Sequence, residues 1–161
     1  MSPNRHHARS SRFAILVLLA SFAVTTFAAE GQFSAALRTR LQADALTEID
    51  LGKVGPFAWE DMYIFHPRTT REENCKVVAV DWFECRFTFP SVVGDDEYFL
   101  VFRRKGQIIR AERHPRGNGA FSASSTRHPQ PVLAAAAVFR VEPASSAAGE
   151  PAFRLEYKRQ E

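Results

Sequence analysis

The feature that most constrains the fold is an unbroken apolar run, Met62 to Phe65, which is closed by Pro67. A strand with one face in water alternates apolar and polar residues, and this run has no polar member. The sequence therefore predicts a strand that is buried on both faces and central in its sheet.

Other segments show simpler periodicities. Apolar residues recur every fourth position from Phe33 to Leu41, which predicts a short amphipathic helix. From Thr47 to Leu51 they alternate with charged residues, which predicts a half-buried strand. Thr69 or Thr70, placed before an acidic pair, predicts the capped start of a short helix over Arg71 to Val78.

Two hairpins complete the expected fold. A two-residue turn at Lys105-Gly106 would place Phe102 opposite Ile109 and Leu100 opposite Ala111. A second hairpin is expected between 132–141 and 153–158. The resulting fold class is α+β, with a mainly antiparallel sheet of about five or six strands and one or two short helices on one face.

The N-terminus predicts export. An acid-free start with three arginines precedes an apolar run over 13–29 that ends in small residues, which is typical of a secretory signal peptide. We expect cleavage after Ala28, so that 1–28 is the signal peptide and 29–161 is a single domain, periplasmic or secreted. An uncleaved anchor is the alternative, because 17 apolar residues stand at the short end of what spans a bilayer.

Processing changes the charge balance. The chain has 21 Lys+Arg and 18 Asp+Glu, and three of the arginines lie in 1–28, which leaves 18 of each sign. The basic excess that would suggest a nucleic-acid partner belongs to the export signal, so we expect no nucleic acid. The expected partner is an unknown protein or small molecule in the envelope or outside the cell, and membrane contact is expected only through an uncleaved N-terminal segment.

The two cysteines, Cys75 and Cys85, predict one disulfide in an oxidising compartment. Two buried free thiols are the alternative. Neither cysteine stands in a recognisable nucleophile motif, so we expect no catalytic role for them.

Asp61 is the carboxylate with the strongest case for proton transfer. On a regular strand it would share a face with Trp59, Tyr63 and Phe65, and aromatic surroundings raise the pKa of a carboxyl group. A small hydrolase could then pair Asp61 with His66 or His114. The reading that we favour is that a backbone amide or an arginine satisfies Asp61, because a single carboxylate without a partner base rarely defines a site.

The histidines do not predict a metal site. Three His-Pro pairs occur, at His66, His114 and His128, and none has the short spacing of known ligand motifs. We therefore expect no cofactor and no metal, and we expect these histidines at the proline-terminated ends of strands.

The segment F-x-W-E-D-M-Y-I-F-H-P-R-T, Phe57 to Thr69, resembles one found in small, functionally uncharacterised exported bacterial proteins. There a Trp-acid strand ends in Tyr-[Ile/Val]-Phe and is followed by Gly-Pro-Tyr-Thr and a short helix. This chain has His66 and Arg68 where that pattern tends to have Gly and Tyr, which argues against His66 as a shared metal ligand. The resemblance implies an envelope or extracellular location and no known activity.

The expected function is that of an exported, non-enzymatic binding or interaction protein, because the residues serve core and turns and form no catalytic motif. Its predicted binding residues are Trp59, Asp61, Tyr63 and Arg68, which include residue types that dominate protein interfaces. The alternatives are the small hydrolase and an envelope protein retained by an uncleaved anchor.

Overall fold

The structure is a computed structural model that describes residues 31–43, 45–122, 130–144 and 152–158. In chain order its elements are α1 (Gln32–Ala43), β1 (Glu48–Asp50), the 3-10 turn η1 (Leu51–Lys53), β2 (Asp61–Phe65), α2 (Arg71–Val78), α3 (Trp82–Thr88), β3 (Glu97–Arg104), β4 (Gln107–Pro115), η2 (Arg116–Asn118), β5 (Ala120–Phe121), β6 (Val132–Leu133), η3 (Ala134–Ala136), β7 (Val138–Ala144) and β8 (Ala152–Tyr157). The predicted signal peptide, 1–28, lies outside the described residues.

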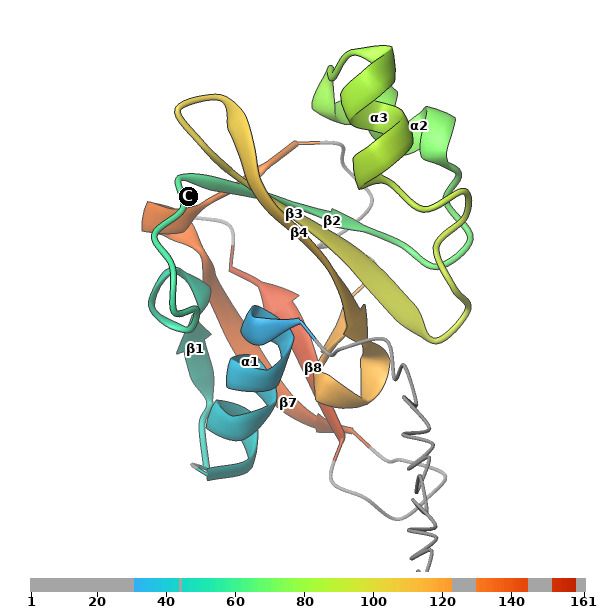
Figure 1. The fold of residues 1–161 in the computed structure, drawn as a ribbon. Helices are drawn as coiled ribbons and strands as arrows, with labels where there is room; N and C mark the ends of the chain where they lie inside the picture. The colour runs from blue at the N-terminus through green and yellow to red at the C-terminus, as the bar shows by residue number, and fades with distance from the viewer. Residues whose placement is uncertain (1–30, 44, 123–129, 145–151, 159–161) are drawn as a thin grey trace, which may run out of the picture.

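The strands of the described residues form two four-stranded sheets, ordered β4-β3-β2-β6 and β1-β7-β8-β5, and among these strands only β5 and β8 pair in parallel. The predicted α+β class is confirmed. The described strands outnumber the five or six expected, because β5 and β6 have two residues each and are too short to show an alternating pattern. Figure 1 shows α1 and the second sheet on one side of β2 and β3, with α2 and α3 on the other side.

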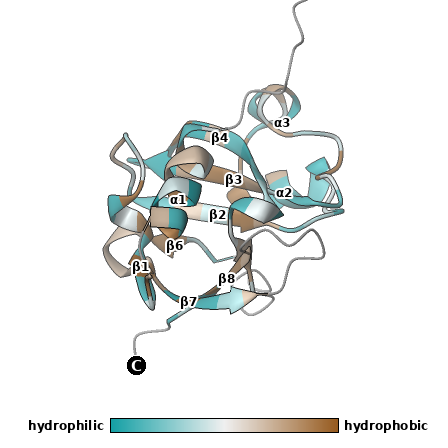
Figure 2. Ribbon diagram, turned by 90° about the horizontal axis from the view of Figure 1, so that it is seen from below, coloured by the Kyte–Doolittle hydropathy of each residue, from teal (hydrophilic) through white to brown (hydrophobic). Residues whose placement is uncertain are grey.

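Both faces of β2 and β3 are covered, as the apolar run at Met62 predicts. Met62 and Ile64 of β2 pack into the main core between the two sheets, together with the apolar face of α1. Tyr63 and Phe65 point the other way, into a smaller cluster under α2 that includes the buried Phe89. In Figure 2 the middle of the central β3 is accordingly hydrophobic, whereas β4 at the sheet edge is largely hydrophilic.

The two predicted helices form where their signals place them. Phe33, Leu37 and Leu41 are the buried apolar residues of α1. α2 spans the predicted residues and begins with a capping box, in which Thr70 Oγ1 accepts from the Glu73 backbone N–H and the Thr70 N–H donates to the Glu73 carboxylate.

The predicted register of the β3–β4 hairpin is wrong by one residue. Phe102 stands opposite Arg110 and Leu100 opposite Glu112, because the pairing shifts between Phe102 and Arg103. Ile109 consequently stays 44% exposed instead of joining the core. The shift also turns two polar residues of β4, Glu112 and His114, toward α1, where both are buried.

Candidate functional site

The predicted binding residues lie mostly in the interior. Trp59 and Tyr63 are 6% and 7% exposed. Trp59 packs against Phe102 in the main core, with ring centroids 5.6 Å apart, whereas Tyr63 lies in the cluster on the opposite face of β2. The expectation that Trp59 shares a face with Asp61 and Tyr63 is therefore wrong, because the regular strand begins only at Asp61.

Asp61 is paired with an arginine from the neighbouring strand. Its Oδ1 accepts from Arg103 Nε at 2.7 Å and its Oδ2 from Arg103 Nη2 at 3.3 Å, and the guanidinium lies 4.9 Å from the centroid of the Tyr63 ring. The hydrogen bond to Asp61 raises the pKa of Arg103, and burial raises the pKa of Tyr63. This group ties β2 to β3, as the favoured reading of Asp61 expects.

Arg68 is the predicted binding residue with a solvent-exposed side chain. Its Nε donates to Asp95 Oδ1 at 2.7 Å, and the two side chains are 79% and 68% exposed. Its backbone lies in the left-handed region, with φ of 69°. An exposed ion pair of this kind contributes at most about 1 kcal/mol, so the guanidinium can exchange this partner for another anion.

His114 is fully buried and lies at the centre of a polar network. Its Nε2 lies 2.8 Å from the Gly119 carbonyl oxygen, which can only accept, so Nε2 carries the proton and donates. Nδ1 of the neutral ring then accepts from the Ser34 hydroxyl at 2.8 Å, and Ser34 Oγ accepts from Asn118 Nδ2 at 2.9 Å. Burial lowers the pKa of His114 to about 4.

Glu112 completes this network by capping α1 from another element. Ser34 N and Phe33 N donate to its two carboxylate oxygens at 2.8 and 3.4 Å, and Arg110 Nε donates to it at 2.7 Å. A side chain at Gly31 would displace the Glu112 carboxylate from this position, since a Cβ there would lie 2.2 Å from its carboxyl carbon. The network therefore docks the first turn of α1 onto β4 and η2; its buried members are Ser34, Glu112, His114 and Asn118.

The hydrolase alternative requires Asp61 within hydrogen-bond reach of His66 or His114. Asp61 bonds to Arg103, and His114 bonds to Ser34 and Gly119. Among the residues that the structure describes, no group of three or more His, Cys, Asp or Glu side chains is placed to hold a metal ion. Asp61 and His114 are bonded to other groups, so the geometry gives that pair no support as a hydrolase site.

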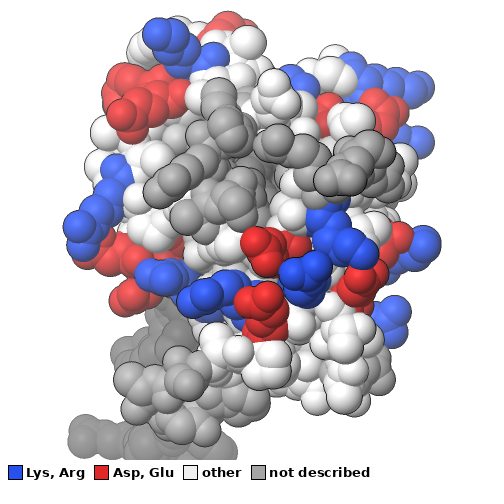
Figure 3. Space-filling view, turned by 180° about the vertical axis from the view of Figure 1, so that it is seen from behind, with Lys and Arg blue, Asp and Glu red and all other residues white. Residues whose placement is uncertain are grey.

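A surface groove of about 840 Å³ runs between the start of α1 and β4. Its charged lining is largely paired within the protein: Arg110 with Glu112, and Arg113 with Glu97. On the face shown in Figure 3, positive and negative groups are interspersed in the same way, without a large field of one sign. The groove thus presents little unpaired charge to a ligand.

Among the residues that the structure describes, the most exposed large apolar side chains lie on α3. This helix turns its apolar residues to solvent and its more polar residues to the protein. The residues that face the protein are half-buried and mostly polar: Glu84, Cys85 and Thr88. The rings of Trp82, Phe83 and Phe87 point to solvent and are 74%, 66% and 71% exposed. We call the outward set the aromatic face of α3; it comprises Trp82, Phe83, Arg86 and Phe87.

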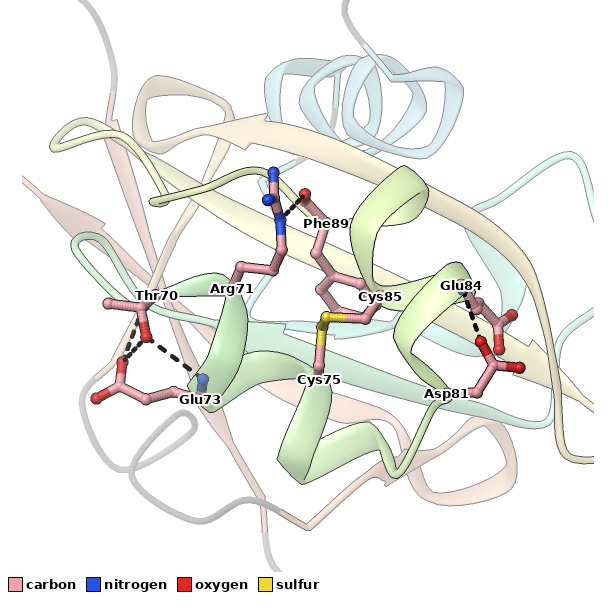
Figure 4. Close-up of a disulfide and its surroundings, with 8 residues drawn as sticks. All are labelled: Thr70, Arg71, Glu73, Cys75, Asp81, Glu84, Cys85 and Phe89. Atoms are coloured by element: carbon pink, nitrogen blue, oxygen red, sulfur yellow. Dashed lines mark hydrogen bonds between the residues drawn. A yellow bond between two sulfur atoms is a disulfide. The ribbon is translucent and has the colours of Figure 1, made fainter.

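Covalent and local contacts hold α3 in place (Figure 4). The predicted disulfide joins Cys75 of α2 to Cys85 at a Cα–Cα distance of 5.5 Å. Asp81 caps the start of the helix, where its Oδ1 accepts from Glu84 N at 2.8 Å. At the other end Phe89 is buried, and its carbonyl accepts from Arg71 Nε at 2.9 Å. A seven-residue helix is marginal alone, so these attachments fix its orientation.

Hydrophobic collapse does not explain this orientation. Three rings about 70% exposed present about 400 Å² of apolar surface, at about 200 Å² per aromatic side chain. Patches of this size on soluble proteins are often interaction sites. The rings of Phe83 and Phe87 touch one another, with centroids 4.6 Å apart, so these two rings form one continuous surface.

Comparisons with protein-family models, with curated proteins and with solved structures found no match for the chain. The resemblance to small exported proteins therefore stays a prediction. The candidate site is defined by the geometry of α3 alone.

Sequence reasoning missed the aromatic face because it ended the helical region at Val78. A signal for a second helix was present, since Asp81 followed three residues later by Glu84 is an N-terminal capping pattern. The pattern could not show which way the rings point. Aromatic residues on one side of a helix ordinarily indicate the buried side.

Proposed function

We propose that the protein is an exported, non-enzymatic binding protein that contacts its partner through the aromatic face of α3. One observation carries the proposal: a helix fixed by a disulfide directs Trp82, Phe83 and Phe87 into solvent, while its half-buried residues Glu84, Cys85 and Thr88 face the protein. Leaving these rings exposed forgoes stabilisation, because burying them would stabilise the folded chain by about 1.5–3 kcal/mol each. A contact made after folding is the simplest reason to keep them.

Export is supported by the N-terminal pattern and by the Cys75–Cys85 bond, which is compatible with an oxidising compartment. Among the described residues, no helix has both the length and the apolarity needed to cross a bilayer. Retention by residues 13–29 remains the alternative form of this proposal, and those residues lie outside the described ones.

The proposal reassigns the predicted binding residues. Trp59, Asp61 and Tyr63 act in the core and in the link between β2 and β3. Arg68 remains a candidate contact residue because its side chain is exposed. The three rings of α3 are the main contact residues in this proposal.

Site-specific photo-crosslinking in living cells tests this proposal. A benzophenone amino acid replaces Phe87 on the aromatic face or, as a matched control, Leu133, which is 55% exposed on β6. We expect light-dependent adducts at position 87 and few at position 133. Equal labelling at both positions, or none at either, would refute the proposed contact surface, and the intact mass of the purified chain shows whether 1–28 has been removed.

A further inference from the structure

We propose that the partner of the aromatic face of α3 is an anionic phospholipid bilayer, into whose interface Trp82, Phe83 and Phe87 insert while Arg86 meets the headgroup phosphates. This inference rests on the proposed function and names the partner class for the same site. It concerns a contact made by the folded domain, separate from the uncleaved N-terminal segment.

The size of the face does not require a protein partner. A stable protein–protein complex buries about 800 Å² on each partner, polar and apolar surface together. The three rings offer about 400 Å² of apolar surface, and other residues would have to supply the rest of such an interface. A bilayer interface has no minimum area, because each inserted apolar group contributes in proportion to its own surface.

The shape of the site also fits a flat or deformable partner. Figure 1 shows α3 at the outer edge of the molecule, beyond the sheet that it adjoins, and away from α1 and the second sheet. No residue of α3 is buried, so the helix projects as a ridge. A projecting ridge of rings can enter a lipid interface without any change of the fold.

One basic side chain of α3 is placed to meet an anionic surface. The charged residue of the aromatic face is Arg86, which lies between Trp82 and Phe87 along the helix. Of the two acids of the segment, Asp81 caps the helix with an exposed carboxylate, and Glu84 is half-buried. Tryptophan and phenylalanine beside a basic side chain are the residue types found at membrane interfaces.

The disulfide reduces the conformational entropy that α3 would lose on insertion into a bilayer. A flexible segment loses conformational freedom when it binds, whereas α3 is already tethered at Cys85 and capped at Asp81. The rings are thus presented in a fixed orientation before contact.

Vesicle co-sedimentation tests the inference with the full chain purified after export. The probes are vesicles of phosphatidylcholine alone and vesicles of phosphatidylcholine and phosphatidylglycerol in equal parts. We expect binding to the mixed vesicles, reduced about tenfold by Phe83→Ala or Phe87→Ala. The matched controls Leu133→Ala and Ile109→Ala remove exposed apolar side chains outside α3 and should leave binding unchanged. Circular dichroism confirms that each variant is folded.

The charge is tested separately. Arg86→Gln should weaken binding to mixed vesicles about fivefold and leave binding to phosphatidylcholine alone unchanged. Arg104→Gln, an exposed arginine at the end of β3, is the control and should have little effect. On binding, Trp82 fluorescence should shift to shorter wavelength, and Trp82→Phe should bind without this shift because Trp59 is already buried.

The outcomes separate this inference from the proposed function. Absence of vesicle binding, or equal binding by the ring variants and their controls, overturns the lipid partner. If photo-adducts at position 87 then contain protein, the binding function stands and the partner class is wrong. A dimer that Phe83→Ala dissociates in analytical ultracentrifugation would identify a second copy as the partner and would also overturn the lipid inference. If neither vesicles nor adducts are found, both proposals fail.

Discussion

Acidification should destabilise the protein through His114, the centre of the buried network at α1. Burial lowers the pKa of this histidine to about 4 in the folded chain, whereas a histidine in an unfolded chain has a pKa of about 6.5. Between these values the unfolded state binds a proton that the folded state does not. The contribution of neutral His114 is therefore complete above about pH 6.5 and is lost as the pH falls through this window.

The size of the effect follows from the two pKa values. A difference of about 2.5 pKa units corresponds to about 3 kcal/mol, of which about 2 kcal/mol is lost by about pH 5. The structural reason lies in the direction of the hydrogen bonds. A protonated ring would donate from Nδ1 as well, and the Ser34 hydroxyl, which already accepts from Asn118, would have to turn its own proton away from the ring.

Urea unfolding of the wild type and of His114→Gln, followed by circular dichroism, measures this contribution. Glutamine keeps a donor for the Gly119 carbonyl and does not titrate. Between about pH 7 and pH 5 the free energy of unfolding should fall by about 2 kcal/mol more in the wild type than in the variant. Carboxylates titrate in both proteins, so their effect cancels in the comparison.

Parallel pH dependence of the two proteins would refute this reasoning. If His114→Gln does not fold, the ring can be followed in the wild type by NMR. The His114 resonances should keep their neutral positions down to about pH 5, and a midpoint near pH 6.5 would show that the ring is not held neutral by burial.

The remaining predictions concern stability and use the same unfolding assay. Asp61→Asn leaves the largely buried Arg103 without its charge partner and should lower the free energy of unfolding by about 2 kcal/mol. Asp95→Asn, in an exposed ion pair, should lower it by less than about 1 kcal/mol. Equal losses would contradict the argument from burial. Thr70→Ala removes the cap of α2 and should cost about 1 kcal/mol, and Thr39→Ala on the exposed side of α1 should cost almost nothing. Cys85→Ser opens a loop closed over a sequence separation of ten residues and should lower the free energy of unfolding by about 2.5–3 kcal/mol. The wild type treated with a reductant should lose a similar amount. No loss in either case would show that α3 is held by other contacts.

Local sequence signals predicted the parts of the fold that depend on local physics. The four-residue period placed α1, the Thr70 capping pattern placed the start of α2, and the unbroken apolar run identified β2 as a strand covered on both faces. In each case the information lies within a few residues of the element. The Cys75–Cys85 bond was predictable for the same reason, because the loop is short.

The sequence-based predictions failed where residues distant in the sequence determine the structure. The hairpin register depends on an irregularity at Phe102, and the turn sequence does not encode it. The burial of Glu112 and His114 depends on α1, which is about 80 residues away and supplies the donors and the hydroxyl that satisfy them. The outward rings of α3 could not be predicted from composition, because an apolar helix face is normally read as core.

The disulfide that attaches α3 determines when the protein becomes able to bind its proposed partner. In a reducing cytosol the bond between Cys75 and Cys85 would stay open, and a helix with no buried residue would lack its principal constraint. If the chain is exported as proposed, oxidation after translocation is the event that finishes the contact surface. Newly made molecules would then be unable to engage targets prematurely on the wrong side of the membrane.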